Sequence, residues 1–285
     1  MPMTDTLENI TATSHKPLIM GILNVTPDSF SDGGQYNNLE QAVNRGLQMI
    51  EQGADIIDIG GESTRPGAAI VSMAEQMSRI VPVIKSLRSK TKVLLSVDTT
   101  DVTVAKAALD VGANWINDVS AGEDAQTSED PEPMFSLSAK MNVPIVLMHR
   151  QGKSATMQDA PVYDDVCLEV KEYLLERARL AERVGVSKSN IILDPGIGFG
   201  KLLEHNLALL SDMTSLASLG YSILLGTSRK RFIGEICKED NPKKRIAGTC
   251  ATTALGVAAG VQIFRVHDVI ENRQAADITW EICSY

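Results

Sequence analysis

Eight short apolar runs, spread along most of the chain, are the feature that most restricts how this sequence can fold. They are LIMGIL (18–23), DIIDIG (55–60), KVLLSVD (92–98), WIND (115–118), PIVLMH (144–149), IILDPG (191–196), SILLG (222–226) and QIFRVH (262–267). Segments with helical periodicity separate most of the runs, as at 39–54 and 101–113. Strands that are apolar on both faces and alternate with helices are typical of a parallel sheet covered by helices.

The number of these strand and helix units predicts a closed barrel. No G-x-G-x-x-G motif follows the first run, as it would in a doubly wound dinucleotide-binding fold. Eight units in 285 residues therefore favour an α/β fold of the (β/α)8 TIM barrel type, as a single domain over residues 17–285. Residues 1–16 are polar and aperiodic, which predicts a flexible N-terminal arm. The seventh unit is ambiguous, because its helical stretch is split into 228–237 and 244–260 around Pro242.

The charge balance restricts the class of partner. The chain has 27 Lys and Arg against 36 Asp and Glu, a formal net charge of −9. An acidic chain is a poor match for nucleic acid or for a membrane surface, so an anionic ligand would need a local cationic site. No apolar run approaches the roughly 20 residues that span a membrane, and residues 1–16 lack the pattern of a signal peptide. A cytoplasmic location is expected.

Polar side chains stand at the end of almost every predicted strand. They are Asn24, Glu62 to Arg65, Asp98, Asn117 with Asp118, His149, Asp194, Ser228 to Lys230, and Arg265 with His267. Barrel enzymes build their sites from these strand ends and from the loops that follow. Each residue could instead cap the next helix, and for Asp118 or Ser120 the two interpretations are equally good. As a set, the residues favour one convergent polar site.

The residue types at these ends suggest a ligand with two parts. Four residues offer donors and acceptors suited to the edge of a flat, amide-bearing ring, namely Asp98, Asn117, Asp194 and Lys230, and the apolar side chains of Val119, Met148 and Phe199 could cover its faces. Arg65, Arg265 and His267 could bind an anion, the last two just before a helix, where barrels often bind phosphate. An ion pair of Arg265 with Asp268 or Glu271, and a capping role for His267, are the alternatives. A metal ion, if bound, would suit oxygen ligands such as Asn24 and a phosphate, which favours Mg²⁺.

Eight motifs in order extend this interpretation from Pro17 to the final helix. They are GILNVTPDSFSDGG, GADIIDIGGESTRPG, SVDT, WINDVS, VLMHRQG, LDPGIGFGK, GTSRKRFIG and RVHDV. Together they closely resemble the dihydropteroate synthase family, pterin-binding enzymes of folate biosynthesis. The resemblance implies a (β/α)8 barrel and a homodimer that uses Mg²⁺ and is a target of sulfonamides. The implied reaction is the condensation of 6-hydroxymethyl-7,8-dihydropterin diphosphate with p-aminobenzoate to 7,8-dihydropteroate and pyrophosphate.

The resemblance also implies a role for individual residues. The pterin pocket would comprise Asp98, Asn117, Val119, Met148, Asp194, Phe199, Gly226 and Lys230. Asn24, Arg265 and His267 would meet the pyrophosphate, with Asn24 as the protein's ligand to the metal. The p-aminobenzoate site would use Phe30, Thr64, Arg65, Pro66 and Ser228. The implied catalytic residues are Asp98, Lys230, Arg265 and His267.

The implied mechanism is dissociative, and it gives a reason for two polar segments. Pyrophosphate leaves first, a carbocation forms on the exocyclic methylene, and the neutral aniline nitrogen attacks it. Asp98 would oppose the positive charge rather than act as a general base. Because such a cation must be kept from water, segments 25–36 and 62–69 are expected to be lids that close over the site, the alternative being passive surface loops.

Some features depart from the family pattern, and two other functions stay open. Arg150 with the GKSAT that follows it, and Arg231, are unusual for the family and are expected to lie beside the pocket.

One alternative is a methyltetrahydrofolate-type methyltransferase barrel, which shares the Asp and Asn pocket but needs no diphosphate site. The other is a catalytically silent pterin-binding paralogue, which would lack a key residue. Arg265, His267 and the first lid segment count against both.

Overall fold

The computed structural model describes residues 16–26, 35–62, 71–125, 127, 130–152 and 161–285. The arm expected over 1–16, apart from Lys16, lies outside these residues. Most of the two expected lid segments also lies outside them. Those expectations therefore stay predictions.

Eight parallel strands close into a barrel in chain order. They are β1 (Leu18–Asn24), β2 (Ile56–Gly60), β3 (Leu94–Asp98), β4 (Trp115–Asp118), β5 (Ile145–Met148), β6 (Ile191–Asp194), β7 (Ser222–Leu225) and β8 (Ile263–Val266). The closure is made by β1 and β8, which pair in parallel with Leu18 opposite Ile263. Each strand coincides with a predicted apolar run, β1 extending one residue further to Asn24, and the predicted (β/α)8 barrel is confirmed.

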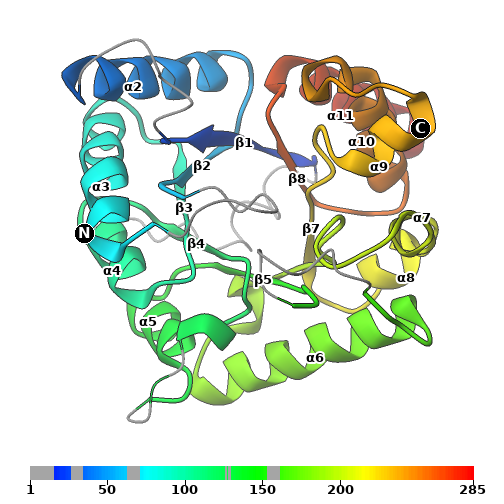
Figure 1. Cartoon of the computed structure of the whole chain (residues 1–285), viewed down its shortest axis with the longest axis horizontal. Helices are drawn as coiled ribbons and strands as arrows, with labels where there is room; N and C mark the ends of the chain where they lie inside the picture. Colours follow the sequence, from blue (N-terminus) through cyan, green and yellow to red (C-terminus); the bar gives the residue numbers. More distant parts are fainter. Residues whose placement is uncertain (1–15, 27–34, 63–70, 126, 128–129, 153–160) are drawn as a thin grey trace.

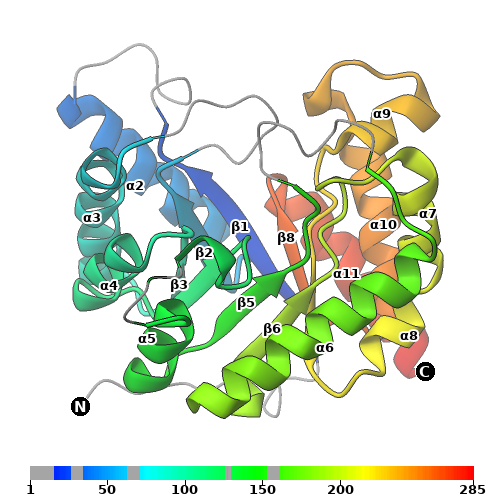
Figure 2. The same cartoon turned by 60° about the horizontal axis from the view of Figure 1, so that its bottom comes forward.

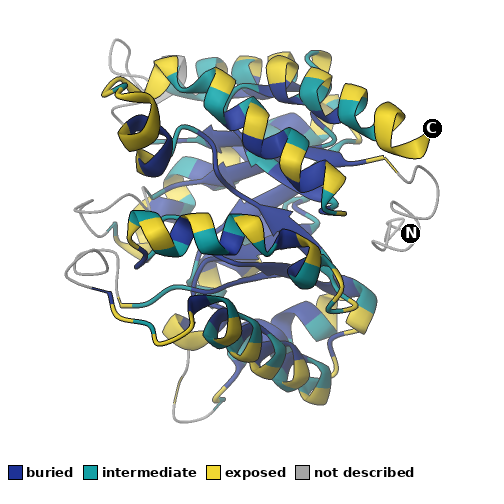
Figure 3. Cartoon of the chain, turned by 90° about the vertical axis from the view of Figure 1, so that its right-hand side faces the viewer, coloured by how far each residue is buried: buried dark blue, intermediate teal, exposed yellow. Residues whose placement is uncertain are grey.

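Helices form an outer ring around the strands (Figure 1). They are α2 (Gln35–Glu51), α3 (Met73–Lys90), α4 (Val102–Asp110), α5 (Pro133–Met141), α6 (Val166–Val184), α7 (Leu203–Ser211), α8 (Met213–Ala217), α9 (Arg231–Cys237), α10 (Ile246–Ala258) and α11 (Val269–Ser284). In Figure 2 helix α6 lies in front of the barrel. In Figure 3 the exposed positions lie on the outward helix faces while the strands are buried. In the described part of the chain, no helix combines the length and the apolar character that crossing a membrane requires.

The split in the seventh unit is confirmed and has a local cause. Helix α9 ends at Cys237 because Lys238 adopts a left-handed conformation with φ 53°. A short 3₁₀ turn (Pro242–Lys244) follows, and the side chain of Asn241 caps it by accepting from the Lys243 amide. Helix α10 then begins at Ile246, so two helices stand between β7 and β8.

The interior of the barrel changes character along its axis. Its amino-terminal part is filled by a buried apolar cluster of Leu18, Met20, Ile56, Trp115, Val146, Ile192, Leu224 and Ile263. Side chains two residues apart on a strand point to the same face, so the next inward residues after Ile56, Trp115, Ile192 and Ile263 are Asp58, Asn117, Asp194 and Arg265. The apolar layer therefore supports a polar layer at the carboxyl ends of the strands.

Candidate active site

A cavity of about 1050 Å³ opens at the carboxyl ends of the strands. Its lining contains most of the predicted site residues, namely Asn24, Asn117, Val119, Met148, Asp194, Phe199, Gly226, Ser228, Lys230, Arg265 and His267. Phe30, Thr64, Arg65 and Pro66 fall outside the described residues. The structure thus brings Asn117, Asp194 and Lys230 into one space with Arg265 and His267. Asp98 is not on the lining and is linked to it through Arg265.

Arg265 joins two buried carboxylates at the floor of this cavity. Its Nε lies 2.6 Å from Asp58 Oδ2, and its Nη2 lies 2.6 Å from Asp98 Oδ2. Burial raises the pKa of Asp98 to about 7, although Arg265 opposes the shift. The alternative that paired Arg265 with Asp268 or Glu271 is wrong in its partners, because the side chain turns inward across the barrel instead of outward to α11. This buried cluster therefore contains two carboxyl groups but one guanidinium, so the guanidinium cannot neutralise both of them.

Asp194 and Lys230 face the same space from neighbouring strand ends. Asp194 Oδ1 accepts a 2.7 Å hydrogen bond from the Gly196 amide, and burial raises the pKa of Asp194 against the opposing effect of Lys230. Burial lowers the pKa of Lys230 to about 8. The Lys230 ammonium donates to the Ile197 carbonyl and lies 4.3 Å from the centre of the Phe199 ring. An acceptor, a donor and an aromatic face are therefore placed within one pocket.

The loop after β6 depends on a glycine. Gly196 has φ 66°, and a Cβ atom at that position would lie 1.8 Å from the His149 carbonyl oxygen. A side chain is excluded both by the left-handed backbone and by the neighbouring chain. This close approach explains the glycine of the DPG motif, which begins at Asp194.

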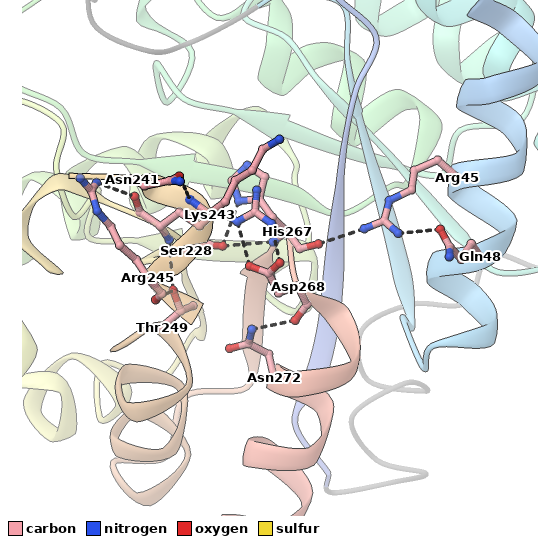
Figure 4. Close-up of polar contacts among 11 residues, drawn as sticks. Arg45, Gln48, Ser228, Asn241, Lys243, Arg245, Thr249, His267, Asp268 and Asn272 are labelled. Carbon is pink, nitrogen blue, oxygen red and sulfur yellow. Dashed lines mark hydrogen bonds and ion pairs between the residues drawn. The ribbon is translucent and has the colours of Figure 1, made fainter. Parts of the chain in front are cut away.

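The loops after β7 and β8 are fastened together beside the cavity (Figure 4). Ser228 Oγ lies 2.9 Å from His267 Nδ1 and accepts a 3.1 Å bond from the His267 amide. Arg229 Nε donates to Asp268 Oδ2 over 2.8 Å, and a second bond joins the same two side chains. Arg45 on α2 donates to the His267 carbonyl over 3.2 Å, as the dashed line in Figure 4 shows. Ser228 and His267, two predicted site residues, are thus joined to each other by hydrogen bonds.

The carboxylate of Asp118 serves the loop after β4 rather than the first turn of a helix. Its Oδ1 accepts from the Ser120 amide and hydroxyl at 2.8 and 2.6 Å, and its Oδ2 accepts from the Gly122 amide at 2.7 Å. Both carboxylate oxygens are therefore used within its own loop. Asp118 holds the chain after β4 and leaves the cavity to Asn117.

The two unusual arginines behave differently. Arg150 Nη2 lies 2.5 Å from Asp124 Oδ1. Arg231, whose side chain is 83% exposed, pairs with Glu235 and lies on the cavity lining. Helix α9 starts at Arg231 and places its side chain at the outer edge of the cavity.

Sequence reasoning missed two buried charged residues, Asp58 and Lys201. Lys201 is 3% exposed, and its Nζ lies 2.9 Å from His149 Nδ1 and 3.0 Å from the Phe199 carbonyl oxygen. Burial lowers the pKa of Lys201 to about 7, and burial together with Lys201 lowers the pKa of His149 to about 3. A signal was present in each case: Asp58 interrupts an apolar strand, and Lys201 closes the DPGIGFGK motif.

We expect His149→Gln to change how stability depends on pH. The unfolded chain protonates His149 near pH 6.5, whereas burial and Lys201 keep the folded residue neutral down to a pKa of about 3. The stabilisation is therefore present above pH 6.5 and is lost as the pH falls towards 3, by at most about 1.4 kcal/mol per pH unit. Urea unfolding of both proteins at pH 7, 6, 5 and 4 measures this difference. Parallel curves would contradict it, and His205→Gln on α7 serves as the control.

Comparison with known proteins identifies the family. The model of the pterin binding enzyme family matches residues 20–267. A dihydropteroate synthase from Synechocystis sp. is 44% identical over 265 residues, which cover 92% of this chain and 90% of the relative. The chain belongs to the dihydropteroate synthase family. As a member of this family it is a transferase of folate biosynthesis, and the resemblance of the eight motifs is confirmed.

Solved structures of dihydropteroate synthases share the whole fold. That of Xanthomonas albilineans with 4-aminobenzoic acid aligns with a TM-score of 0.86 at 44% identity and covers 95% of this chain and 94% of that one. The complex of a Xanthomonas albilineans dihydropteroate synthase with 7,8-dihydropteroate aligns with a TM-score of 0.83 at 41% identity and covers 95% of each chain. Dihydropteroate synthase structures therefore share the barrel that carries this cavity.

Proposed function

We propose that this cavity binds 6-hydroxymethyl-7,8-dihydropterin diphosphate and p-aminobenzoate and condenses them to 7,8-dihydropteroate and pyrophosphate. One observation carries the proposal: the acceptor Asp194 and the candidate anion-binding residues Arg265 and His267 line the same space. A ring with several N–H groups and an attached diphosphate needs both. The related proteins solved with 4-aminobenzoic acid and with 7,8-dihydropteroate support the choice of substrates.

The ring would lie between polar edges and apolar faces. Asp194 would accept from the amino and ring N–H groups of the pterin, and such charge-assisted bonds are strong in a dry site. Asn117 and Lys230 would meet the remaining edge, while Val119, Met148 and Phe199 would cover the faces. A methyltetrahydrofolate-type methyltransferase would use the same ring pocket, but it has no need for Arg265 and His267.

The diphosphate would meet Arg265 and His267, with Asn24 close by on the lining. The donor set fits Mg²⁺: the cation keeps several waters and takes few protein oxygens beside substrate phosphates, and Asn24 supplies one amide oxygen. Among the described residues no group of three or more His, Cys, Asp and Glu gathers as a self-sufficient metal cage, which agrees with a cation held mainly by the substrate. When bound, Mg²⁺ would neutralise charge on the diphosphate.

In the proposed mechanism the bond from the exocyclic methylene to the diphosphate oxygen breaks first. Arg265 and His267 would stabilise the charge on the leaving pyrophosphate. Asp98, held by Arg265, would face the cation left on the methylene and oppose its charge. The aniline nitrogen of p-aminobenzoate would then form the new C–N bond and lose a proton to the released pyrophosphate or to water. Its carboxylate would lie near Ser228 and, as the resemblance implies, Arg65.

A homodimer and a cytoplasmic location complete the proposal. Helices α10 and α11 lie side by side (Figure 1) and expose Leu255, Ile278 and Ile282, whose exposed fractions are 66%, 63% and 71%. Exposed apolar side chains on adjacent helices are suited to an interface with a second copy. We assign the dimer contact to this surface.

The test is turnover of the purified protein with the pterin diphosphate, labelled p-aminobenzoate and Mg²⁺, with and without a sulfonamide. We expect labelled dihydropteroate that disappears when the sulfonamide is added. Pterin binding with no product would contradict synthase activity. It would instead favour the methyltransferase or the silent paralogue.

A further inference from the structure

We infer that Asp58 is a positioning residue that fixes the directions of Asn117 and Arg265, so that Asn117 presents an acceptor oxygen to the bound ring. The inference rests on the proposed pterin site and deepens it. Asp58 is fully buried on β2, below the lining of the cavity. It acts through its two neighbours rather than by touching the substrate.

A single oxygen atom of Asp58 holds both neighbours. Asp58 Oδ2 accepts from Asn117 Nδ2 over 2.9 Å and from Arg265 Nε over 2.6 Å. Asn117 comes from β4 and Arg265 from β8, so this oxygen links three strands across the barrel interior. Both donors are charge-assisted partners of a carboxylate in a site without bulk water, where such bonds are strongest.

The carboxylate decides which end of the Asn117 amide faces the cavity. An ionised carboxylate can only accept hydrogen bonds, so the group that lies 2.9 Å from it must be the NH₂ of Asn117. A flipped amide would set its oxygen against Asp58 and would repel it. Asn117 is 2% exposed and lines the cavity, so its carbonyl oxygen is the atom left for a ligand. The ring must therefore offer an N–H or NH₂ group at this position.

The same carboxylate limits the motion of Arg265. With Asp58 and Asp98 bound to different nitrogens, the guanidinium is held at two points. Without Asp58 it would keep one partner in the described part of the chain and could rotate about that contact. A guanidinium held by one contact can rotate, so its remaining N–H groups no longer point in a fixed direction.

The experiment compares Asp58→Leu, Asp58→Asn and a control, Ser96→Ala. Ser96 pairs with Asp58 in strand register and is fully buried, but its hydroxyl has no hydrogen-bond partner among the described residues. Calorimetry with 6-hydroxymethylpterin gives Kd, steady-state kinetics give KM for p-aminobenzoate, and thermal unfolding shows whether each variant folds.

We expect Asp58→Leu to weaken the pterin Kd by roughly tenfold or more, with KM for p-aminobenzoate changed by less than about twofold. Asp58→Asn should stay within about threefold of the wild-type Kd, because its amide oxygen can accept from both donors. Ser96→Ala should bind as the wild type does. This rescue by an isosteric acceptor separates positioning from general loss of packing.

Several results would overturn the inference. The inference is wrong if Asp58→Leu folds and binds the pterin with the wild-type Kd. It is also wrong if Asp58→Asn folds and its affinity for the pterin falls tenfold. If Asp58→Leu does not fold, a crystal structure of the wild type with the pterin decides, because a ring acceptor opposite Asn117 is incompatible with the inference. Wild-type protein that binds no 6-hydroxymethylpterin would overturn the proposed function itself, a different result from a change among the variants.

Discussion

Arg265→Ala is expected to abolish measurable turnover and to lower the free energy of unfolding by about 3–5 kcal/mol. The substitution removes the cation that pairs with Asp58 and Asp98 and leaves two buried carboxylates without their counter-charge. It also removes a donor expected to stabilise the leaving pyrophosphate. Urea unfolding measures the first effect and labelled product formation measures the second.

A graded variant and a control make this prediction specific. Arg265→Lys keeps the charge but has no planar fork to reach two carboxylates, so we expect a smaller loss of stability and still at least about a hundredfold loss in kcat/KM. Arg273→Ala on α11 removes an arginine that pairs with Asp55, away from the cavity, and should leave turnover near wild type. Arg265→Ala with wild-type turnover would remove Arg265 from the site.

The loss in Arg265→Ala should also depend on pH. Burial raises the pKa of Asp98 and Arg265 opposes this, so removing Arg265 raises the pKa of Asp98 further. A carboxyl with a raised pKa in the folded state contributes stability at low pH, which is lost as the pH rises through that pKa. The variant should therefore be closer to the wild type at pH 5 than at pH 8. A constant difference across this range would contradict the buried charge imbalance.

Asp194→Asn is expected to weaken pterin binding by about 2–4 kcal/mol, or about 30-fold to 1000-fold in Kd. The charged acceptor would be replaced by an amide that offers an NH₂ group to ring N–H donors. Its backbone partner, the Gly196 amide, can still be satisfied by the remaining oxygen, so the loop should persist. Calorimetric titration with 6-hydroxymethylpterin measures the change.

Asp118→Asn is the matched control for this substitution. Asp118 is buried at the end of β4, but both of its oxygens bond within its own loop. The variant should lose stability and keep its pterin affinity. Equal losses of affinity in the two variants would show that any buried carboxylate in this region supports binding, and the assigned role of Asp194 would fail.

The fold could be predicted because its signal is local and repeated. Each of the eight apolar runs, and each helix between them, can be recognised from its own residues. The barrel is the arrangement that covers both faces of every strand. Even the split at Pro242 was visible, because a proline affects the chain within a few residues. The location of the site could also be predicted, because parallel strands in a barrel place their carboxyl ends at the same end of it.

The partners of the site residues could not be predicted in this way. Asp118 and Asn117 are adjacent in the sequence and both end the same strand, yet one holds its own loop and the other lines the cavity. Which of them faces inward depends on the pleat of β4 in the assembled barrel. The two residues have the same neighbours in the sequence, so the sequence does not show which of them lines the cavity.

The sequence by itself determined the strand and helix order, the polar end of the barrel and, through the ordered motifs, the family. Only the tertiary structure decided that Arg265 crosses the interior to Asp58, 207 residues away, and that Asp58 also holds Asn117. Hydrogen bonds and ion pairs between buried side chains depend on distances that exist only after the barrel closes. The periodicity of apolar residues in the sequence indicates which positions are buried. The direction in which a buried charged side chain points is set by the few groups that surround it in the folded protein.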